Sequence, residues 1–233
     1  MLKIDVITIF PNIFDNFTNF GVIKEGINKK LCELNIYNLR EFTEDKHKKV
    51  DDRPYGGGAG MVFMVQPIDS AVRHIKEKND VLKINLQKTI LLTPSGDKLK
   101  QNTLKYLSGM ENLILICGRY EGVDERIKDL VVDMEISIGD FILTGGEIPA
   151  MVLIDGVIRL LKGVVGKEES LKNESFENDL LDYPQYTRPD LYKGLKVPDV
   201  LLSGNHSKIK KWREEKSVEI TRKKRPDLFD KNH

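Results

Sequence analysis

The chain alternates short apolar runs with longer segments in which apolar residues recur at helical spacing. Runs typical of buried strands occupy residues 3–10, 34–39, 88–93, 112–117 and 131–136. Segments with helical periodicity lie between them, at residues 12–32 (with a break near Gly21), 67–78, 98–107, 122–130 and 146–161. Strands that alternate with helices in this way predict an α/β fold with a mostly parallel sheet covered by helices.

The pattern changes after residue 161. Residues 162–178 are polar, contain Gly and Glu, and lack periodicity, which is typical of a flexible linker or a lid. Pro184, Pro189 and Pro198 follow, and then an amphipathic helix is predicted over residues 205–223. We therefore expect a first domain over residues 1–161, a linker over 162–178 and a smaller, mainly helical domain over 179–233.

Composition is typical of a globular protein without a membrane span. Of the 233 residues, 40% are hydrophobic and 31% are charged, and no apolar run approaches the roughly 18 residues that a spanning helix needs. The N-terminal run contains Asp5 and indicates a buried strand rather than a signal peptide. Two cysteines are too few for a disulfide scaffold, and the four histidines are too scattered for a zinc site. We expect a cytoplasmic protein in which Cys117 is a buried, inert thiol.

Charge is unevenly distributed, although the net formal charge is only +1. Residues 204–233 hold ten Lys or Arg against five Asp or Glu, whereas residues 162–182 hold three against six. A basic stretch of this kind is typical either of a solvated helix face or of a surface that contacts phosphates. Charge alone leaves both interpretations open.

Glycines gather where three of the predicted strands end. Residues 93–97 follow one strand, residues 118–122 follow the next, and residues 139–146 follow the last. Ligands of α/β sheets bind at such strand ends, where backbone without side chains can approach a small molecule. The three ends predict one pocket for an extended cofactor with an adenosine end. Ser95 or Asp97 is expected to cap the helix that follows.

Four glycines within five positions mark the loop at residues 51–61. The loop lacks the Gly-Lys-Ser/Thr ending of a P-loop and the G-x-G-x-x-G spacing of a dinucleotide site. It is either a flexible connection or, because Asp51, Asp52 and Arg53 lie beside the glycines, a loop whose backbone approaches a partner. The chain also lacks the Gly-x-Ser-x-Gly and His-Glu-x-x-His motifs, so nothing indicates hydrolysis.

Charged side chains on either side of the linker are candidates for chemistry. Arg159 lies in an otherwise apolar helical stretch, where it either faces solvent or marks the edge of a pocket. Glu174, Asp179 and Asp182 cluster near the end of the linker, and such carboxylates are mostly solvated or cap helices. One of them would serve as a general base if this segment folds onto the pocket.

These motifs resemble one family over nearly the whole chain. The resemblance rests on residues 51–61, 92–96, 117–126, 137–151, 175–176, 180–184, 186–189 and 201–206. These stretches are similar to the bacterial tRNA (guanine-N1)-methyltransferases, the TrmD family of the SPOUT class. The resemblance implies an α/β fold with a deep C-terminal trefoil knot, and an obligate homodimer with each active site at the subunit interface.

The same resemblance implies the reaction and its cofactors. The enzyme would transfer a methyl group from S-adenosyl-L-methionine to N1 of the guanine at position 37 of tRNA, just 3′ to the anticodon. It would also need Mg²⁺, with Glu121 as the candidate ligand. S-adenosylmethionine would be bound in a bent shape by knot loops that correspond to Pro94, Ser95, Gly96, Gly118, Tyr120, Glu121, Gly122, Ser137, Ile138, Gly139, Phe141, Leu143, Gly145 and Gly146.

The proposed chemistry needs a base and a cation. Guanine N1 carries a proton that a carboxylate must remove as the methyl group moves, and a cation should stabilise the negative charge that grows on O6. By the family pattern, Arg159 is this cation, and the base immediately precedes Ser175. The family usually has Asp at that position, whereas this chain has Glu174, which is one methylene longer. Glu174 is the expected base, with Asp182 as the alternative.

The resemblance also favours an RNA-contacting surface over a merely solvated one. The residues expected to bind tRNA are Asp51, Arg53, Gly60, Ser203, Asn205, His206, Lys208, Lys211 and Arg213. Two other functions stay open: a SPOUT methyltransferase that acts on another RNA, such as ribosomal RNA, and an RNA-binding protein that has lost catalysis. The strings around Asp182 and Asn205 argue against the first, and the intact cofactor loops argue against the second.

Overall fold

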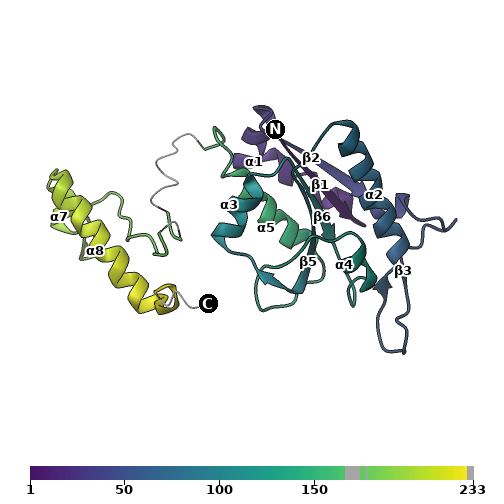
Figure 1. The fold of residues 1–233 in the computed structure, drawn as a ribbon. Helices are drawn as coiled ribbons and strands as arrows, with labels where there is room; N and C mark the ends of the chain where they lie inside the picture. The colour runs from purple at the N-terminus through teal and green to yellow at the C-terminus, as the bar shows by residue number, and fades with distance from the viewer. Residues whose placement is uncertain (166–173, 177, 230–233) are drawn as a thin grey trace. The chain divides into compact units, whose positions relative to one another are not determined.

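The computed structural model describes residues 1–165, 174–176 and 178–229 (Figure 1). The chain forms two compact units, Met1–Gly166 and Lys167–His233. Half of the expected linker, residues 166–173 and 177, lies outside the described residues. Val164, which the sequence pattern assigns to that linker, is buried in the core of the first unit.

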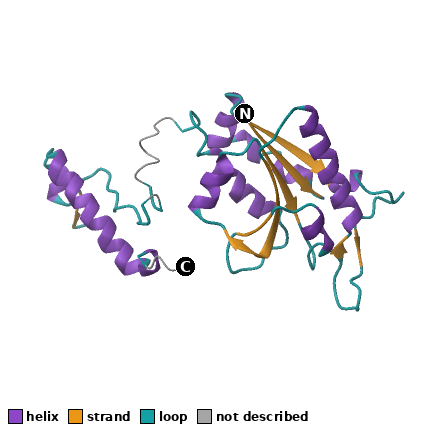
Figure 2. Cartoon of the chain, viewed as in Figure 1, coloured by secondary structure: helices purple, strands orange, loops and turns teal. Residues whose placement is uncertain are grey.

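Five parallel strands form the central sheet of the first unit, in the order β2-β1-β6-β5-β7 (Figures 1 and 2). The strands are β1 (Leu2–Thr8), β2 (Cys32–Asn38), β5 (Gln87–Lys98), β6 (Asn112–Cys117) and β7 (Met134–Ser137). β6 lies between β1 and β5, so that Val6 and Ile90 both pair with Leu115. The expected parallel sheet is confirmed, and the carboxyl ends of its strands meet at one edge.

Helices cover both faces of this sheet (Figure 2). One core contains residues of α1 (Gly21–Asn28), α3 (Gln101–Ser108) and α5 (Glu147–Ile158), and the other contains residues of α2 (Val65–Val81) and α4 (Arg126–Leu130). Successive residues of β6 alternate between the two cores: Leu113 and Leu115 enter the first, and Ile114 and Ile116 enter the second. A strand buried on both faces is apolar throughout, which explains the uninterrupted run in the sequence.

The chain departs from the predicted elements after Leu92. The sequence predicts a turn and a helix cap there, but β5 continues to Lys98, with residues 93–96 bulging out before Asp97 pairs with Ile136 of β7. Neither Ser95 nor Asp97 caps α3, because its N-cap is Lys100, whose side chain makes no cap hydrogen bond. The cap prediction is wrong because pairing with β7 draws this segment into the sheet.

Two predicted helices begin later than their apolar patterns. Residues 12–20 form 3₁₀ turns, at Pro11–Phe14 and Phe17–Asn19, and α1 begins only at Gly21, where the break was expected. Helix α4 is delayed because Val123 forms a bridge with Phe63. Local periodicity does not report such long-range backbone bonds.

A small hairpin of β3 (Asp51–Asp52) and β4 (Val62–Phe63) completes the first unit. The second unit contains a hairpin of β8 (Leu191–Tyr192) and β9 (Leu195–Lys196), then α7 (Asp199–Leu202) and α8 (His206–Lys224). Thr221 Oγ1 accepts a hydrogen bond from the Leu181 N–H at 2.9 Å, which ties the preceding segment to α8. In the parts of the chain described, every helix is too short or too polar to cross a membrane.

Candidate functional site

A cleft of about 440 Å³ lies at the carboxyl ends of β5, β6 and β7. Its volume falls in the range of roughly 300–1,000 Å³ that is typical of small-molecule sites. The wall consists of the three loops in which the sequence gathers glycines. All but one of the predicted cofactor-binding residues line it: Pro94, Ser95, Gly118, Tyr120, Glu121, Gly122, Ser137, Ile138, Gly139, Phe141, Leu143, Gly145 and Gly146.

Gly96 is the exception, because it packs behind the wall instead of lining the cleft. A Cβ at this position would come within 2.4 Å of the backbone nitrogen of Ile136. Glycine therefore lets the β5 bulge pack directly on β7. Its absent side chain shapes the wall, and a contact between its backbone and a cofactor stays a prediction.

Several residues that line the cleft have positive φ angles, a conformation that favours glycine. Gly122 and Gly139 have φ angles of +121° and +148°. Tyr120 also has a positive φ, +58°, which is uncommon for a residue with a side chain, and its ring meets Phe63 edge-on with 5.6 Å between centroids. Such conformations cluster at ligand sites, where the surrounding structure enforces them.

The loops that follow β6 and β7 are bonded to each other. Arg119 and Gly145 form an isolated antiparallel bridge, and the Gly146 N–H donates to the Gly118 carbonyl at 2.9 Å. A Cβ on Gly146 would lie 2.7 Å from the Cα of Cys117, so only glycine permits this approach. The two sides of the cleft therefore hold each other in place.

A buried ion pair reinforces this junction. Arg119 Nε lies 3.1 Å from Glu147 Oε2, and Glu147 is only 1% exposed. Glu147 Oε1 also accepts a hydrogen bond from the Thr8 hydroxyl at 2.7 Å, and the Arg119 guanidinium lies 4.4 Å from the ring centroid of Phe10. The sequence analysis missed both charged residues. The sequence did contain one signal, because Glu147 begins an otherwise apolar helix. A Glu that is buried in such a place is almost always paired with an opposite charge.

Cys117 lies beside this pair at the end of β6. Its side chain is buried, and burial raises the pKa of the thiol well above its usual value, with the negative charge of Glu147 adding to the effect. A thiol that stays protonated is a poor nucleophile. The expectation of a buried, inert thiol is confirmed.

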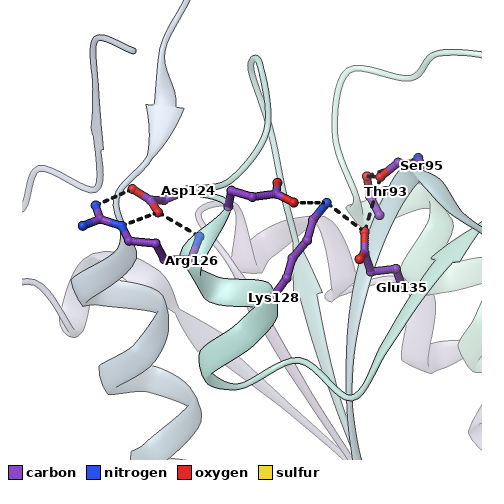
Figure 3. A network of polar contacts seen from close by, with 7 residues as sticks. Thr93, Ser95, Asp124, Arg126, Lys128 and Glu135 are labelled. Carbon is purple, nitrogen blue, oxygen red and sulfur yellow. Dashed lines mark hydrogen bonds and ion pairs between the residues drawn. The ribbon is translucent and has the colours of Figure 1, made fainter. Parts of the chain in front are cut away.

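A second polar network lies along the cleft (Figure 3). Lys128 Nζ bridges two carboxylates, at 2.9 Å from Glu125 and 3.1 Å from Glu135. The Ser95 hydroxyl donates to Glu135 at 3.3 Å, which extends the network to the β5 bulge. Hydrogen bonds to the two carboxylates raise the pKa of Lys128. The network fixes carboxylate oxygens, which accept hydrogen bonds from hydroxyl or amino groups of a ligand.

The glycine-rich loop at residues 51–61 is attached to the cleft through its stem. The Glu121 N–H donates to the Met61 carbonyl at 3.0 Å, and the Phe63 N–H donates to the Gly122 carbonyl at 3.0 Å. The stem therefore continues the backbone hydrogen bonding of the loop that follows β6. These bonds fix the stem of the loop beside the cleft, and its role as a binding loop stays a prediction.

Gly60 lies directly against the candidate metal ligand. A Cβ on Gly60 would come within 2.4 Å of Glu121 Oε1. Asp51, in β3, is half-buried, and Arg53 is exposed in the same hairpin. A hydrogen bond from the Arg53 N–H, aided by Lys49, lowers the pKa of Asp52, so this carboxylate is negative at neutral pH.

The predicted catalytic residues belong to different units. Arg159 is the C-cap of α5 in the first unit. Glu174 and Asp182 belong to the second unit, where both line a cavity of about 500 Å³. Asp182 already accepts hydrogen bonds from the Tyr183 N–H at 2.8 Å and the Gln185 amide at 3.1 Å, which is typical of a carboxylate that shapes a turn.

The predicted tRNA-binding residues of the second unit gather around the start of α8. Ser203 Oγ accepts a hydrogen bond from the Asn205 N–H at 3.2 Å, and Asn205 Oδ1 accepts one from the Lys208 N–H at 3.1 Å. Both polar side chains therefore stabilise the helix start. The exposed basic or imidazole side chains are His206, Lys208, Lys211 and Arg213. Arg213 also stacks its guanidinium on Tyr183, 4.8 Å from the ring centroid.

A cleft walled by glycine loops at the carboxyl edge of a parallel sheet defines an α/β protein that binds a small-molecule cofactor. Residues 2–231 match the family model described as tRNA (Guanine-1)-methyltransferase TrmD. The chain therefore belongs to this family, and the resemblance inferred from the sequence is confirmed.

Individual relatives align with this chain over more than nine-tenths of their own length. A tRNA (guanine-N(1)-)-methyltransferase of Dictyoglomus turgidum is 52% identical, with 99% of this chain and 91% of the relative aligned. The protein of the same name from Clostridioides difficile is 50% identical, over 100% of this chain and 99% of the relative. That of Nostoc punctiforme is 51% identical, over 99% and 94%.

Proposed function

We propose that this protein uses S-adenosyl-L-methionine to methylate N1 of the guanine at position 37 of tRNA, just 3′ to the anticodon. Family membership over the whole chain supports the reaction class. The observation that carries the proposal is the cleft, because it gathers the loops that the family resemblance assigns to the cofactor. Two buried, free cysteines suit a reducing, cytoplasmic setting.

S-adenosylmethionine suits the cleft in size and in chemistry. The glycine-bearing loops at residues 118–122 and 139–146 would hold its adenosine through bare backbone, and the carboxylates fixed by Lys128 offer acceptors. When bound, the cofactor supplies an electrophilic methyl group. The bonds that join these two loops support the further proposal that they belong to a trefoil knot.

Methylation requires that guanine lose its N1 proton. Glu174 is the proposed base, and Arg159 is the proposed cation near O6, where negative charge develops. Asp182 is the alternative base, and its two oxygens accept hydrogen bonds from the Tyr183 N–H and the Gln185 amide. Arg159 belongs to the first unit, and Glu174 belongs to the second.

The active site is proposed to lie at the interface of a homodimer. The first unit exposes large apolar side chains beside the cleft and on α5, among them Ile142, Ile148 and Val152. Exposed apolar side chains that gather on one part of a surface are typical of association sites. Their burial between subunits would remove this surface from water.

Glu121 is the proposed protein ligand of Mg²⁺. Within the described residues, no three His, Cys, Asp or Glu side chains form a group that could hold a metal ion. Mg²⁺ is commonly held by only one or two carboxylates, with water and substrate phosphates completing its shell. A single carboxylate beside the substrate is therefore compatible with a magnesium requirement.

A methyl-transfer assay tests the proposal. Tritiated S-adenosylmethionine is mixed with a tRNA transcript that has guanine at position 37, and in parallel with the same transcript carrying adenine there. Label on the guanine transcript alone is the expected result. Label on both would contradict the assigned position, and label on neither, with the cofactor still bound in a titration, would indicate another RNA target or a lost base.

A further inference from the structure

The loop between β3 and β4 carries an aromatic side chain that no described part of the chain covers. Tyr55 is fully exposed. The three glycines after it have φ angles of +83°, +79° and +116°, and a Cβ built on any of them would meet nothing within 4 Å. Figure 1 shows this loop extending away from the sheet beyond β3. An uncovered ring contributes no burial to the stability of the fold, and both of its faces are available to a partner.

The stem of the loop is fixed by backbone hydrogen bonds, although the tip is exposed. β3 pairs with β4 through Asp52 and Val62, and the Met61 carbonyl accepts a hydrogen bond from the Glu121 N–H. Glu121 and its neighbours line the cofactor cleft. The loop that carries Tyr55 is therefore anchored at the edge of the cleft of the same unit.

The surroundings of the ring are cationic and polar. Arg53 lies two positions before Tyr55, and its side chain is exposed. The negative charge of Asp52 is offset by Lys49, whose Nζ lies 3.0 Å away. The core of a protein interface groups several closely packed anchors, with Tyr, Trp and Arg prominent among them. A single ring beside Arg53 and a run of glycines fits a nucleic acid, whose bases stack on aromatic faces while arginines contact phosphates.

The proposed reaction creates a need for such a ring. N1 lies on the Watson–Crick edge of guanine, and enzymes that modify a base take it out of its stack to reach the target atom. Removing one base exposes the face of its neighbour. We propose that Tyr55 stacks on the anticodon-loop base adjacent to the target guanine and replaces the contact that the guanine has left. This inference rests on the proposed function and adds a positioning residue to it.

Two substitutions at Tyr55 separate stacking from other roles. Tyr55→Ala should weaken the binding of an anticodon stem-loop about 5- to 100-fold, whereas Tyr55→Phe, which keeps the ring, should stay within about twofold of the unaltered protein. The slope of log affinity against log salt should be the same in both variants, because neither loses a phosphate contact. Affinity for S-adenosylmethionine should also stay unchanged. Tyr106→Ala, which removes a 48% exposed ring from α3 of the same unit, is the matched control.

A fluorescent base analogue reports the stacking directly. With 2-aminopurine placed beside the target guanine, the unaltered protein and Tyr55→Phe should quench its emission, and Tyr55→Ala should leave it brighter. Equal quenching by all three, or unchanged affinity in Tyr55→Ala, would overturn the inference. A changed salt slope or a changed oligomeric state in Tyr55→Ala would also overturn it, by assigning the residue to phosphates or to a subunit contact. Failure of the proposed function is distinguishable, because the unaltered protein would then not label the guanine transcript.

Discussion

The first unit buries two polar clusters that differ in what they hold together. Beside the cleft, Arg119 and Glu147 offset each other's charge and join the loops that follow β6 and β7. Farther back in the sheet, the fully buried carboxylate of Asp5 accepts hydrogen bonds from the side-chain amides of Asn35 and Asn112, at 3.0 and 2.5 Å. The first cluster shapes a site, whereas the second links the adjacent strands β2, β1 and β6. A buried charge therefore indicates function only when the segments that it joins form a site.

Removing the Glu147 carboxylate should have the largest effect. In Glu147→Ala, Arg119 loses its buried partner and the Thr8 hydroxyl loses its acceptor. The free energy of unfolding should fall by about 3 kcal/mol, because the Arg119 side chain, only 21% exposed, keeps its charge without a partner. Affinity for S-adenosylmethionine should fall as well. Urea unfolding and calorimetric titration measure the two effects.

The double variant Arg119→Met with Glu147→Leu is the control for this prediction. Replacing both charges with apolar side chains should recover most of the stability. Cofactor affinity should stay low, because the ion pair that joins the two loops is gone. Full recovery of affinity would show that the pair stabilises the fold without shaping the cleft.

Asp5→Ala should have a smaller effect, confined to stability. The Asn35 amide loses its acceptor, and the Asn112 amide keeps only the Lys3 carbonyl at 3.3 Å. Losing hydrogen bonds of buried groups in this way typically costs about 1–3 kcal/mol of unfolding free energy. At temperatures where the variant stays folded, cofactor affinity and methyl transfer should match those of the unaltered protein. A loss of affinity under those conditions would abolish the distinction between the two clusters.

Two glycine substitutions test whether the position of Glu121 in the cleft affects methyl transfer. Gly60 and Gly57 have φ angles of +86° and +79°, so alanine at either position brings similar backbone strain, about 1 kcal/mol. Only at Gly60 would the new Cβ collide with Glu121. Single-turnover methyl transfer should therefore fall more in Gly60→Ala, by about tenfold or more, because small misplacements in an active site are expensive in rate. Equal losses in both variants would mean that Glu121 is not disturbed.

The smallest effect is expected at the surface pair of Asp124 and Arg126. Hydrogen bonds from Arg126 lower the pKa of Asp124 below its ordinary value of 3.8. A carboxylate with a lowered pKa stabilises the folded state fully above its unfolded pKa, and this stabilisation is lost as the pH falls through the lowered value. Thermal melts should show the unaltered protein slightly more stable than Asp124→Asn at neutral pH, with the difference shrinking below about pH 4. A difference that grows towards acid would contradict the assignment.

The sheet and the position of the cleft were predictable because both follow from local patterns. The apolar run at residues 112–117 and the glycines directly after it indicate a buried strand and a ligand-facing end. The predictions were wrong where backbone pairing with a distant segment overrides the local sequence pattern. Ser95 lies in a bulge within β5 because Asp97 rejoins β7, and α4 begins late because Val123 bridges Phe63.

The contacts that organise the site were not predictable from the chain alone. Arg119 and Glu147 are 28 residues apart, beyond the reach of any helical or strand period. The family resemblance names Gly60 and Glu121 separately, and only the folded chain shows that a side chain on one would strike the other. Residue type indicates which positions are candidates for the site, but only the tertiary structure shows which of these side chains contact one another.

The exposed loop that carries Tyr55 is also expected to be a preferred site of proteolysis. Proteases nick exposed loop tips first, and chymotrypsin cleaves after aromatic residues. A nick after Tyr55 would break the covalent link between β3 and β4. The N-terminal fragment would keep β1 and β2, and β1 would stay paired with β6 of the other fragment in the central sheet, so both fragments would stay associated. Digestion should therefore yield two pieces on a denaturing gel from a particle that still migrates as one under native conditions.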